Sequence, residues 1–230
     1  MQTRLRDNLA QVRQTLAEAA AASGRTADAV RLIGVTKYVD LETTQALLEL
    51  GCHDLGESRP QQLWTKAEAL ASFSPRWHMI GHLQRNKTKR TIPLLSLLHS
   101  GDSLRLLQAA NDDWTGDGRL QALIEVNISG DSAKHGFSPD EIEPALRQIA
   151  ALNRLQIVGL MGMASLDGGR DQAQKDFAAL RQLRDKLRDN CPDEISLDEL
   201  SMGMSHDFDL AIREGATMVR VGSTLFEGLR

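Results

Sequence analysis

The chain of 230 residues has little cysteine, no long apolar run and no large excess of charge of one sign. Cys52 and Cys191 lie far apart and belong to no C-x-x-C pair, so we expect two thiols in a reducing cytosol. The formal net charge is −4, with basic and acidic residues mixed, and nucleic-acid binding is not expected. No window reaches the apolar length of a membrane span, and the charged start does not form a secretory signal. These absences predict a cytoplasmic protein with neither a membrane nor a nucleic-acid partner.

Linkers are also lacking. No segment rich in proline, glycine or serine divides the chain, and its contents of 41% hydrophobic and 25% charged residues are ordinary for a globular protein. A chain of this length can bury a substantial core. We therefore expect a single domain, residues 1–230, and a monomer.

What the chain does contain is a repeated alternation of short apolar runs and helical segments. It begins with an amphipathic helix near 3–22, and Gly, Ser, Asp or Asn stands at the later junctions. The expected strands are 32–37, 53–58, 76–81, 97–102, 120–128, 155–163, 196–203 and 217–223. Strands that alternate with helices pair in parallel, and eight such units predict a closed (β/α)8 TIM barrel with an extra N-terminal helix. A doubly wound open sheet is the alternative.

The segment RLIGVTKYVD, residues 31–40, places Lys37 at the end of an apolar strand and Asp40 at the cap of the next helix. Lysine almost never enters a core unpaired, so Lys37 either snorkels to water or belongs to a site at the strand's C-terminal end. An amine in a low-dielectric pocket is pushed toward its neutral form and can form a Schiff base with a carbonyl.

Two turns rich in glycine and serine follow the last two expected strands, SMGMSHD at 201–207 and VGSTLFEG at 221–228. The loops after strands 7 and 8 form the usual phosphate site of such barrels, where glycine lets backbone N–H groups approach and serine adds hydroxyl donors. Left-handed turns that merely need glycine are the alternative for either turn alone. Both turns together favour an anion site.

Strand alternation places Arg220 on the same face as Gly222, toward the expected ligand. An arginine there fits a second phosphate contact or a contact to the pyridine nitrogen of pyridoxal 5′-phosphate (PLP). A salt bridge to an inward carboxylate, for which Glu57 is available, is the alternative. On these residues alone, a lysine-dependent aldolase acting on a sugar phosphate competes with a PLP protein.

Seven segments in order carry a family resemblance: GVTKYV, GESRPQQLWTKA, WHMIGHLQRNK, VNISGDSAKHGF, GLMGMA, LSMGMSHDFDLAI and MVRVGSTLFEG. From about residue 5 to its end, the chain resembles the YggS/PROSC family of pyridoxal phosphate homeostasis proteins, which are related to the barrel domain of alanine racemase. The resemblance implies a fold-type III barrel that holds PLP on a lysine, and it disfavours the aldolase.

The candidate cofactor-binding residues are Lys37, Ser58, His82, Met163, Ser201, Ser205, Arg220, Gly222 and Ser223. By resemblance, Lys37 matches the Schiff-base lysine, Arg220 the arginine beside the ring nitrogen or phosphate, and Met163 a residue against the ring face. Ser58 stands where many members carry asparagine, and Glu227 replaces a glycine that is usual near the C-terminus. Phosphate-binding positions are matched by Ser201, Ser205, Gly222 and Ser223, whereas His82 is included for its place at the end of the third strand.

Two further features of the sequence are candidates for a metal site and for an anion contact. His78 and His82 have the i, i+4 spacing of a helical metal pair, but a strand places such residues about 13 Å apart, so no metal site is expected. Lys134, in the loop after the fifth strand, is a candidate for transient contact with PLP or another anion.

The expected function is PLP binding without catalysis. Arg220 only donates hydrogen bonds, so beside the pyridine nitrogen it keeps that atom unprotonated and the ring a poor electron sink. The chain ends soon after the eighth strand, and we expect no second domain of the kind that completes alanine racemase. We predict a protein of PLP homeostasis that buffers, protects or delivers the cofactor to apo-enzymes, with no catalytic residues. A racemase-like amino-acid enzyme with weak or partner-dependent activity is the alternative.

Overall fold

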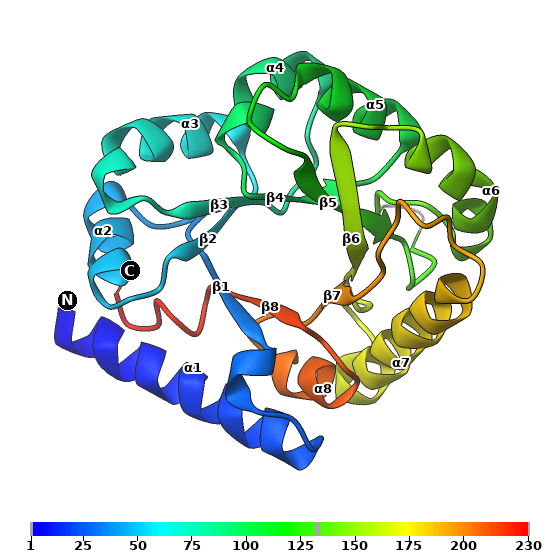
Figure 1. Ribbon diagram of the computed structural model, residues 1–230. Coiled ribbons are helices and arrows are strands. Elements are labelled where there is room, and N and C mark those ends of the chain that lie inside the picture. The colour runs from blue at the N-terminus through cyan, green and yellow to red at the C-terminus, as the bar shows by residue number, and fades with distance from the viewer. Residues whose placement is uncertain (1, 132–133, 230) are drawn as a thin grey trace.

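The computed structural model describes residues 2–131 and 134–229. Eight parallel strands close into a barrel in the order β1 to β8, and helices surround it (Figure 1). The strands are β1 Arg31–Val35, β2 Asp54–Glu57, β3 Arg76–Met79, β4 Leu97–Gly101, β5 Leu120–Val126, β6 Leu155–Gly162, β7 Glu199–Ser201 and β8 Met218–Val221. This architecture confirms the predicted (β/α)8 barrel and excludes the open sheet.

The helices are α1 Gln2–Ala22, α2 Leu41–Glu49, α3 Pro60–Ala69, α4 Thr88–Thr91, α5 Leu104–Asp113, α6 Pro139–Ala150, α7 Gly169–Arg188 and α8 Phe208–Arg213. Short 3-10 helices lie at Ala27–Ala29, Ala71–Phe73, Arg85–Lys87 and Ile92–Leu94. Among the described residues, none of these helices combines the length and the apolar character needed to cross a membrane.

Two apolar layers hold the barrel. The larger layer fills the space between strands and helices, and a smaller cluster that includes Ile33, Leu123 and Met218 fills the inside of the barrel. Because the strands are covered on both faces, β2, β4 and β8 are buried along their whole length. The inner cluster makes the barrel a packed core, so a ligand can enter only at the ends of the strands.

Polar caps fix the points at which loops become helices. The Asp40 carboxylate accepts a hydrogen bond from the backbone N of Thr43 at 2.8 Å and caps α2, as predicted. Ser103 caps α5 in the same way, through the backbone N of Leu106. The Asp40 cap ends the loop that carries Lys37, so it limits where that lysine can lie.

Helix α1 lies against the outside of the barrel beside α8 (Figure 1). It buries an apolar stripe that includes Leu5, Leu9 and Val12. The Asn8 amide donates to the carbonyl oxygens of Leu225 and Glu227, each at 3.0 Å. The extra N-terminal helix therefore braces the final turn, and the exposed Glu227 takes part there through its backbone.

Candidate functional site

The C-terminal ends of the strands, which we call the mouth, enclose a cavity of about 270 Å³. Its lining comes from the ends of β1, β2, β3, β6 and β8 and from the loops after β1, β7 and β8. The lining residues are Val35, Lys37, Tyr38, Ser58, Ile80, Met163, Met204, Ser205, His206, Arg220, Gly222 and Ser223. The volume is close to the lower end of the about 300–1,000 Å³ usual for small-molecule sites.

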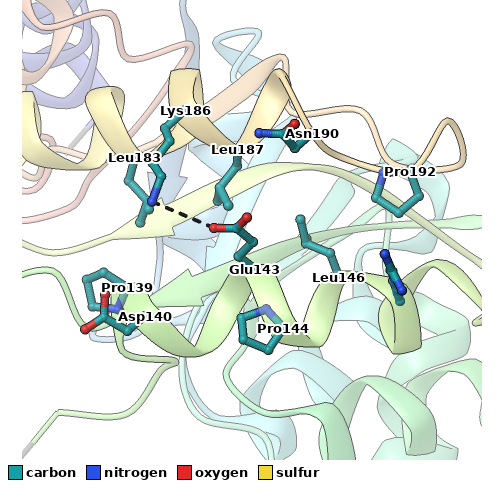
Figure 2. A pocket seen from close by; sticks show the side chains of 11 residues that line it. Pro139, Asp140, Glu143, Pro144, Leu146, Leu183, Lys186, Leu187, Asn190 and Pro192 are labelled. Carbon is teal, nitrogen blue, oxygen red and sulfur yellow. Dashed lines mark ion pairs between the residues drawn. The ribbon is translucent and has the colours of Figure 1, made fainter.

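A larger hollow of about 780 Å³ lies elsewhere, on the outside between α6 and α7. Figure 2 shows Glu143 and Lys186 facing each other across it, and their ion pair of 3.7 Å is exposed. None of the predicted site residues lines this groove. The smaller cavity at the mouth is therefore the candidate site.

Lys37 is half-buried and lines the mouth cavity. Thr36, the residue before it, is held by hydrogen bonds of its backbone and of its side chain. The backbone N of Thr36 donates to the Gly56 carbonyl at 3.0 Å, and its hydroxyl donates to the Glu57 carboxylate at 2.6 Å. The Thr36 carbonyl accepts from Lys66 Nζ at 2.7 Å. The backbone that carries Lys37 is thus fixed.

Glu57 does not pair with Arg220, the alternative considered from sequence. Its carboxylate accepts from Lys66 Nζ at 2.7 Å, and both side chains are buried. Removing either partner of such a pair leaves a buried charge without its counterion, which is strongly destabilising. This ion pair therefore occupies Glu57 at the β1 end of the mouth and leaves Arg220 to other contacts.

Arg220 is buried beneath the cavity, where its guanidinium donates three hydrogen bonds. One terminal nitrogen donates to the Ser201 carbonyl at 2.8 Å and to the Ser201 hydroxyl at 2.6 Å, and the other donates to the Gly162 carbonyl at 3.0 Å. Burial lowers the pKa of Arg220 to about 10, although the Glu125 carboxylate opposes that change. Arg220 therefore keeps its positive charge at neutral pH, and it is one of the residues that line the cavity.

The two turns rich in glycine and serine meet at the Ser205 hydroxyl. Its oxygen accepts from the backbone N of Gly222 at 3.1 Å and of Thr224 at 3.5 Å. Gly203 has φ of +88°, and a Cβ there would lie 2.5 Å from the Cβ of Ala211, so this turn requires glycine. Two backbone donors thus converge on one point in the cavity wall.

The predicted residues fall into two groups. Seven of them line the cavity: Lys37, Ser58, Met163, Ser205, Arg220, Gly222 and Ser223. Ser201 is fully buried below Arg220 and outside the lining. His82 is exposed and also outside the lining, and its Nδ1 bonds Asp102 at 2.7 Å. The contacts of these residues with the cofactor stay predictions. The Ser201 hydroxyl accepts a hydrogen bond from Arg220 and does not line the cavity.

A second group of polar side chains lies at the β3–β5 side of the mouth, and we call His82, Asp102, Glu125 and His135 the titratable cluster. The rings of His82 and His135 stack at 4.2 Å with an angle of 17°. With Asp102 they bring three potential metal-ligand atoms within 4.8 Å of one another. The absence of a metal site stays a prediction from sequence.

Glu125 was missed from sequence. It is buried two residues after the inward-facing Leu123, and burial, with the nearby charge of Asp102, raises the pKa of its carboxyl to about 7. Period-two alternation along 120–128 places both residues on the barrel's inner face and was the available signal. Its raised pKa makes Glu125 a group that exchanges protons near neutral pH.

Lys134 is tied to the loop that follows β6. Its Nζ donates to the Ser129 hydroxyl and to the Ala164 carbonyl, each at 2.8 Å. The two residues that precede it, 132 and 133, lie outside the described residues. In this structure the ammonium of Lys134 holds two loops together beside Met163.

The alanine racemase N-terminal domain family matches residues 3–229 of the chain. A pyridoxal phosphate homeostasis protein of Aquifex aeolicus is 34% identical over 221 residues, which cover 96% of each protein. The chain belongs to the pyridoxal phosphate homeostasis protein family. This confirms the resemblance inferred from the seven ordered segments.

Two solved structures share the fold of this chain. PipY of Synechococcus elongatus PCC7942, with PLP bound, is 32% identical and has a TM-score of 0.81 over 92% of this chain and 99% of that one. An alanine racemase of Clostridium difficile 630 is 14% identical, with a TM-score of 0.72 over 97% of this chain and 55% of that one. The racemase shares the barrel fold and extends well beyond it.

Proposed function

We propose that this protein binds PLP in the mouth cavity through a Schiff base on Lys37, and that it acts in PLP homeostasis. The observation that carries the proposal is one cavity that combines a lysine, two convergent backbone donors and a buried arginine. PLP has an aldehyde, a phosphate and a ring nitrogen, and these three groups match the three features.

Lys37 supplies the amine. The neutral Lys37 Nζ would be the nucleophile toward the aldehyde of PLP, and hydrolysis of the resulting bond would release the cofactor again. The held backbone at Thr36 lets the lysine side chain move while its attachment point stays in place.

The turns after β7 and β8 would hold the phosphate. The N–H groups of Gly222 and Thr224, which here donate to the Ser205 hydroxyl, suit a phosphate oxygen equally well. The hydroxyls of Ser205 and Ser223 add further donors. A Cβ at Gly222 would lie 3.2 Å from Val35, so glycine lets the two strand ends approach closely here.

Arg220 would face the ring nitrogen. Its guanidinium is a permanent donor, so it favours an unprotonated nitrogen and a ring that stabilises carbanions poorly. This supports a carrier in preference to an enzyme. The lengths of the relatives also support a carrier. This chain covers 96% of the Aquifex homeostasis protein but 55% of the racemase.

The role in the cell completes the proposal. A protein that forms a reversible bond to PLP can buffer the free aldehyde, protect it from other amines, and deliver it to PLP-dependent apo-enzymes. The cytoplasmic location and the monomeric state stay predictions from sequence.

A racemase-like enzyme is the second candidate, and Glu125 is the observation that favours it. A carboxyl with a pKa of about 7 near the mouth is suited to general acid–base catalysis at neutral pH. Glu125 does not line the cavity, however, and it lies on the titratable side of the mouth. Turnover of an L- or D-amino acid at about 1–10³ s⁻¹ by the PLP-loaded protein would favour this candidate over the carrier.

The experiment for the proposed function is a PLP titration followed by visible absorbance. We expect saturable binding and a band that differs from that of free PLP. Lys37→Ala should abolish that band, whereas Lys134→Ala, at a second lysine near the mouth, should retain it. Equal loss in both variants, or a normal band in Lys37→Ala, would contradict the assignment.

A further inference from the structure

Below the cavity, Arg220 begins a continuous series of hydrogen bonds that crosses the inside of the barrel. Its guanidinium bonds the Ser201 hydroxyl at 2.6 Å, and that hydroxyl lies 2.9 Å from His99 Nδ1. His99 Nε2 lies 2.9 Å from His78 Nδ1, and His78 Nε2 lies 3.0 Å from the Asp54 carboxylate. We call these five residues the interior chain.

The interior chain joins the two ends of the barrel. Ser201 on β7 and His99 on β4 belong to strands that are not neighbours, so their bond crosses the interior (Figure 1). Asp54 and Arg76 are the first residues of β2 and β3, at the end opposite the mouth. There Arg76 donates two hydrogen bonds to Asp54, at 2.6 and 2.8 Å.

Burial shuts the interior chain off from water. Ser201 and His99 are 0% exposed, and His78 is 1% exposed. Burial lowers the pKa of both imidazoles, that of His99 well below its usual value, so both rings are neutral. Burial alone would raise the pKa of Asp54, but hydrogen bonds from Arg76 and His78 outweigh it and keep the carboxyl ionised.

These charge states fix the direction of every proton. An ionised Asp54 only accepts, so His78 donates from Nε2, and its Nδ1 must then accept. His99 therefore donates from Nε2 to His78 and accepts at Nδ1 from the Ser201 hydroxyl. Ser201 in turn accepts from Arg220, which can only donate.

Starting from Arg220 or from Asp54 gives the same donor and acceptor for every hydrogen bond of the interior chain. Arg220 has no acceptor and Asp54, when ionised, has no donor, so all four hydrogen bonds point from the cation to the anion. Aligned hydrogen bonds polarise one another, and the effect is stronger in a dry interior. The positive charge of Arg220 is thus linked to a carboxylate on the far side of the barrel.

We propose that Ser201, His99, His78 and Asp54 are positioning residues that fix the orientation of the Arg220 guanidinium at the cofactor cavity. This inference rests on the proposed function, because the guanidinium is taken to donate to the ring nitrogen of PLP. The interior chain and the two backbone carbonyls hold one edge of the guanidinium, which leaves the remaining N–H groups for the ligand.

The test compares PLP with its 1-deaza analogue, in which a C–H group replaces the ring nitrogen. The phosphate and the aldehyde are present in both, and the ring's own electronic change is the same for every variant, so the change in the ratio of their dissociation constants from wild type to variant reports the contact at the ring nitrogen. We expect wild type to prefer PLP by about tenfold, the value of one charge-assisted hydrogen bond. His99→Leu should reduce that ratio to nearly one.

Two further variants separate positioning from general damage. His99→Gln keeps an acceptor and a donor in one side chain and should retain most of the preference. Leu98→Ala, at the equally buried neighbour of His99 on β4, lies outside the interior chain and should leave the ratio unchanged even if it destabilises the fold. If His99→Leu does not fold, Ser201→Ala removes the central hydroxyl alone and should lower the ratio in the same way.

The possible results are distinct. A wild-type protein that does not bind PLP at Lys37 overturns the proposed function. Normal PLP binding at Lys37 with no preference over the deaza analogue overturns the inference and the placement of Arg220 at the ring nitrogen, but leaves PLP binding itself standing. A preference that survives both His99→Leu and Ser201→Ala, or that is lost equally in Leu98→Ala, overturns the inference alone.

Discussion

The two sides of the barrel mouth are built from different kinds of group. Around β7, β8 and β1, the groups that face the cavity include backbone N–H groups, serine hydroxyls, a lysine and a charged arginine, together with Tyr38 and His206. Around β3, β4 and β5, the titratable cluster of His82, Asp102, Glu125 and His135 gathers two imidazoles and two carboxyls, and burial raises the pKa of Glu125 to about 7. The first side is suited to holding an anion, and Glu125 on the second side is suited to exchanging a proton near neutral pH.

This difference is consistent with the proposed binding function. The donors that match PLP lie together in one cavity, whereas the titratable cluster lies outside its lining. Enzymes place both kinds of group around the same reacting atoms. The predictions that follow change one side of the mouth at a time.

The largest effect is expected at Arg220. Arg220→Gln removes a buried charge that we place beside the cofactor ring, and it should weaken PLP binding about 10- to 100-fold by equilibrium titration. Arg181→Gln removes an exposed arginine that pairs with Glu214 away from the cavity, and PLP affinity should stay unchanged. Similar affinities for the two variants would place Arg220 outside the binding site.

On the opposite side, Glu125 should affect stability against pH more than PLP binding. Its pKa of about 7 in the folded protein lies above that of the unfolded chain, so between about pH 4.5 and 7 only the folded state binds this proton. Its contribution to stability is therefore present below pH 4.5 and is lost as the pH rises to 7, by about 2–3 kcal/mol.

Glu125→Gln removes this titration. Urea unfolding of both proteins from pH 5 to pH 8 should show the variant gaining stability relative to wild type as the pH rises. The affinity for PLP should change less than twofold. A difference in unfolding free energy that stays constant with pH would mean that Glu125 is ionised throughout this range.

The phosphate turns should show a smaller effect that depends on the ligand. Ser205→Ala and Ser223→Ala should each weaken PLP binding several-fold, because each removes a hydroxyl donor at the phosphate. Pyridoxal, which lacks the phosphate, should bind wild type far more weakly and respond little to either change. Equal losses for both ligands would mean that the two serines hold the fold and not the phosphate.

The smallest effect is expected at His135. His135→Ala removes an exposed ring that stacks on His82. The free energy of unfolding should fall by less than about 1 kcal/mol. PLP affinity should not change, since His135 lies outside the cavity lining. A several-fold loss of PLP affinity would extend the binding site across the mouth and remove the contrast between its two sides.

The sequence predicted the barrel well because hydrophobic periodicity reports strands directly. All eight strands appeared near their expected places, although β7 is only Glu199–Ser201 where 196–203 was expected. Backbone pairing still continues beyond it, because the N of Ser196 donates to the Ile157 carbonyl at 3.0 Å and the N of Met202 donates to the Met218 carbonyl at 3.2 Å. Periodicity gives the existence of a strand more reliably than its ends.

The site was predicted less evenly. Alternation along β8 correctly placed Arg220 and Gly222 toward the cavity, because both follow one strand. It could not show how deep a side chain lies, so Ser201 was expected at the cavity and lies beneath Arg220. The interior chain escaped notice because its bonds join residues between 19 and 102 positions apart, a distance over which sequence patterns report nothing.

The most direct test of the central claim is a peptide map of the PLP complex after reduction with borohydride. Reduction makes the bond between cofactor and lysine permanent, so mass spectrometry of a digest identifies the lysine that holds PLP. The account predicts one major labelled peptide, which contains Lys37, and little label on the peptide that contains Lys134. A label at Lys134 or another lysine, with none at Lys37, would contradict it.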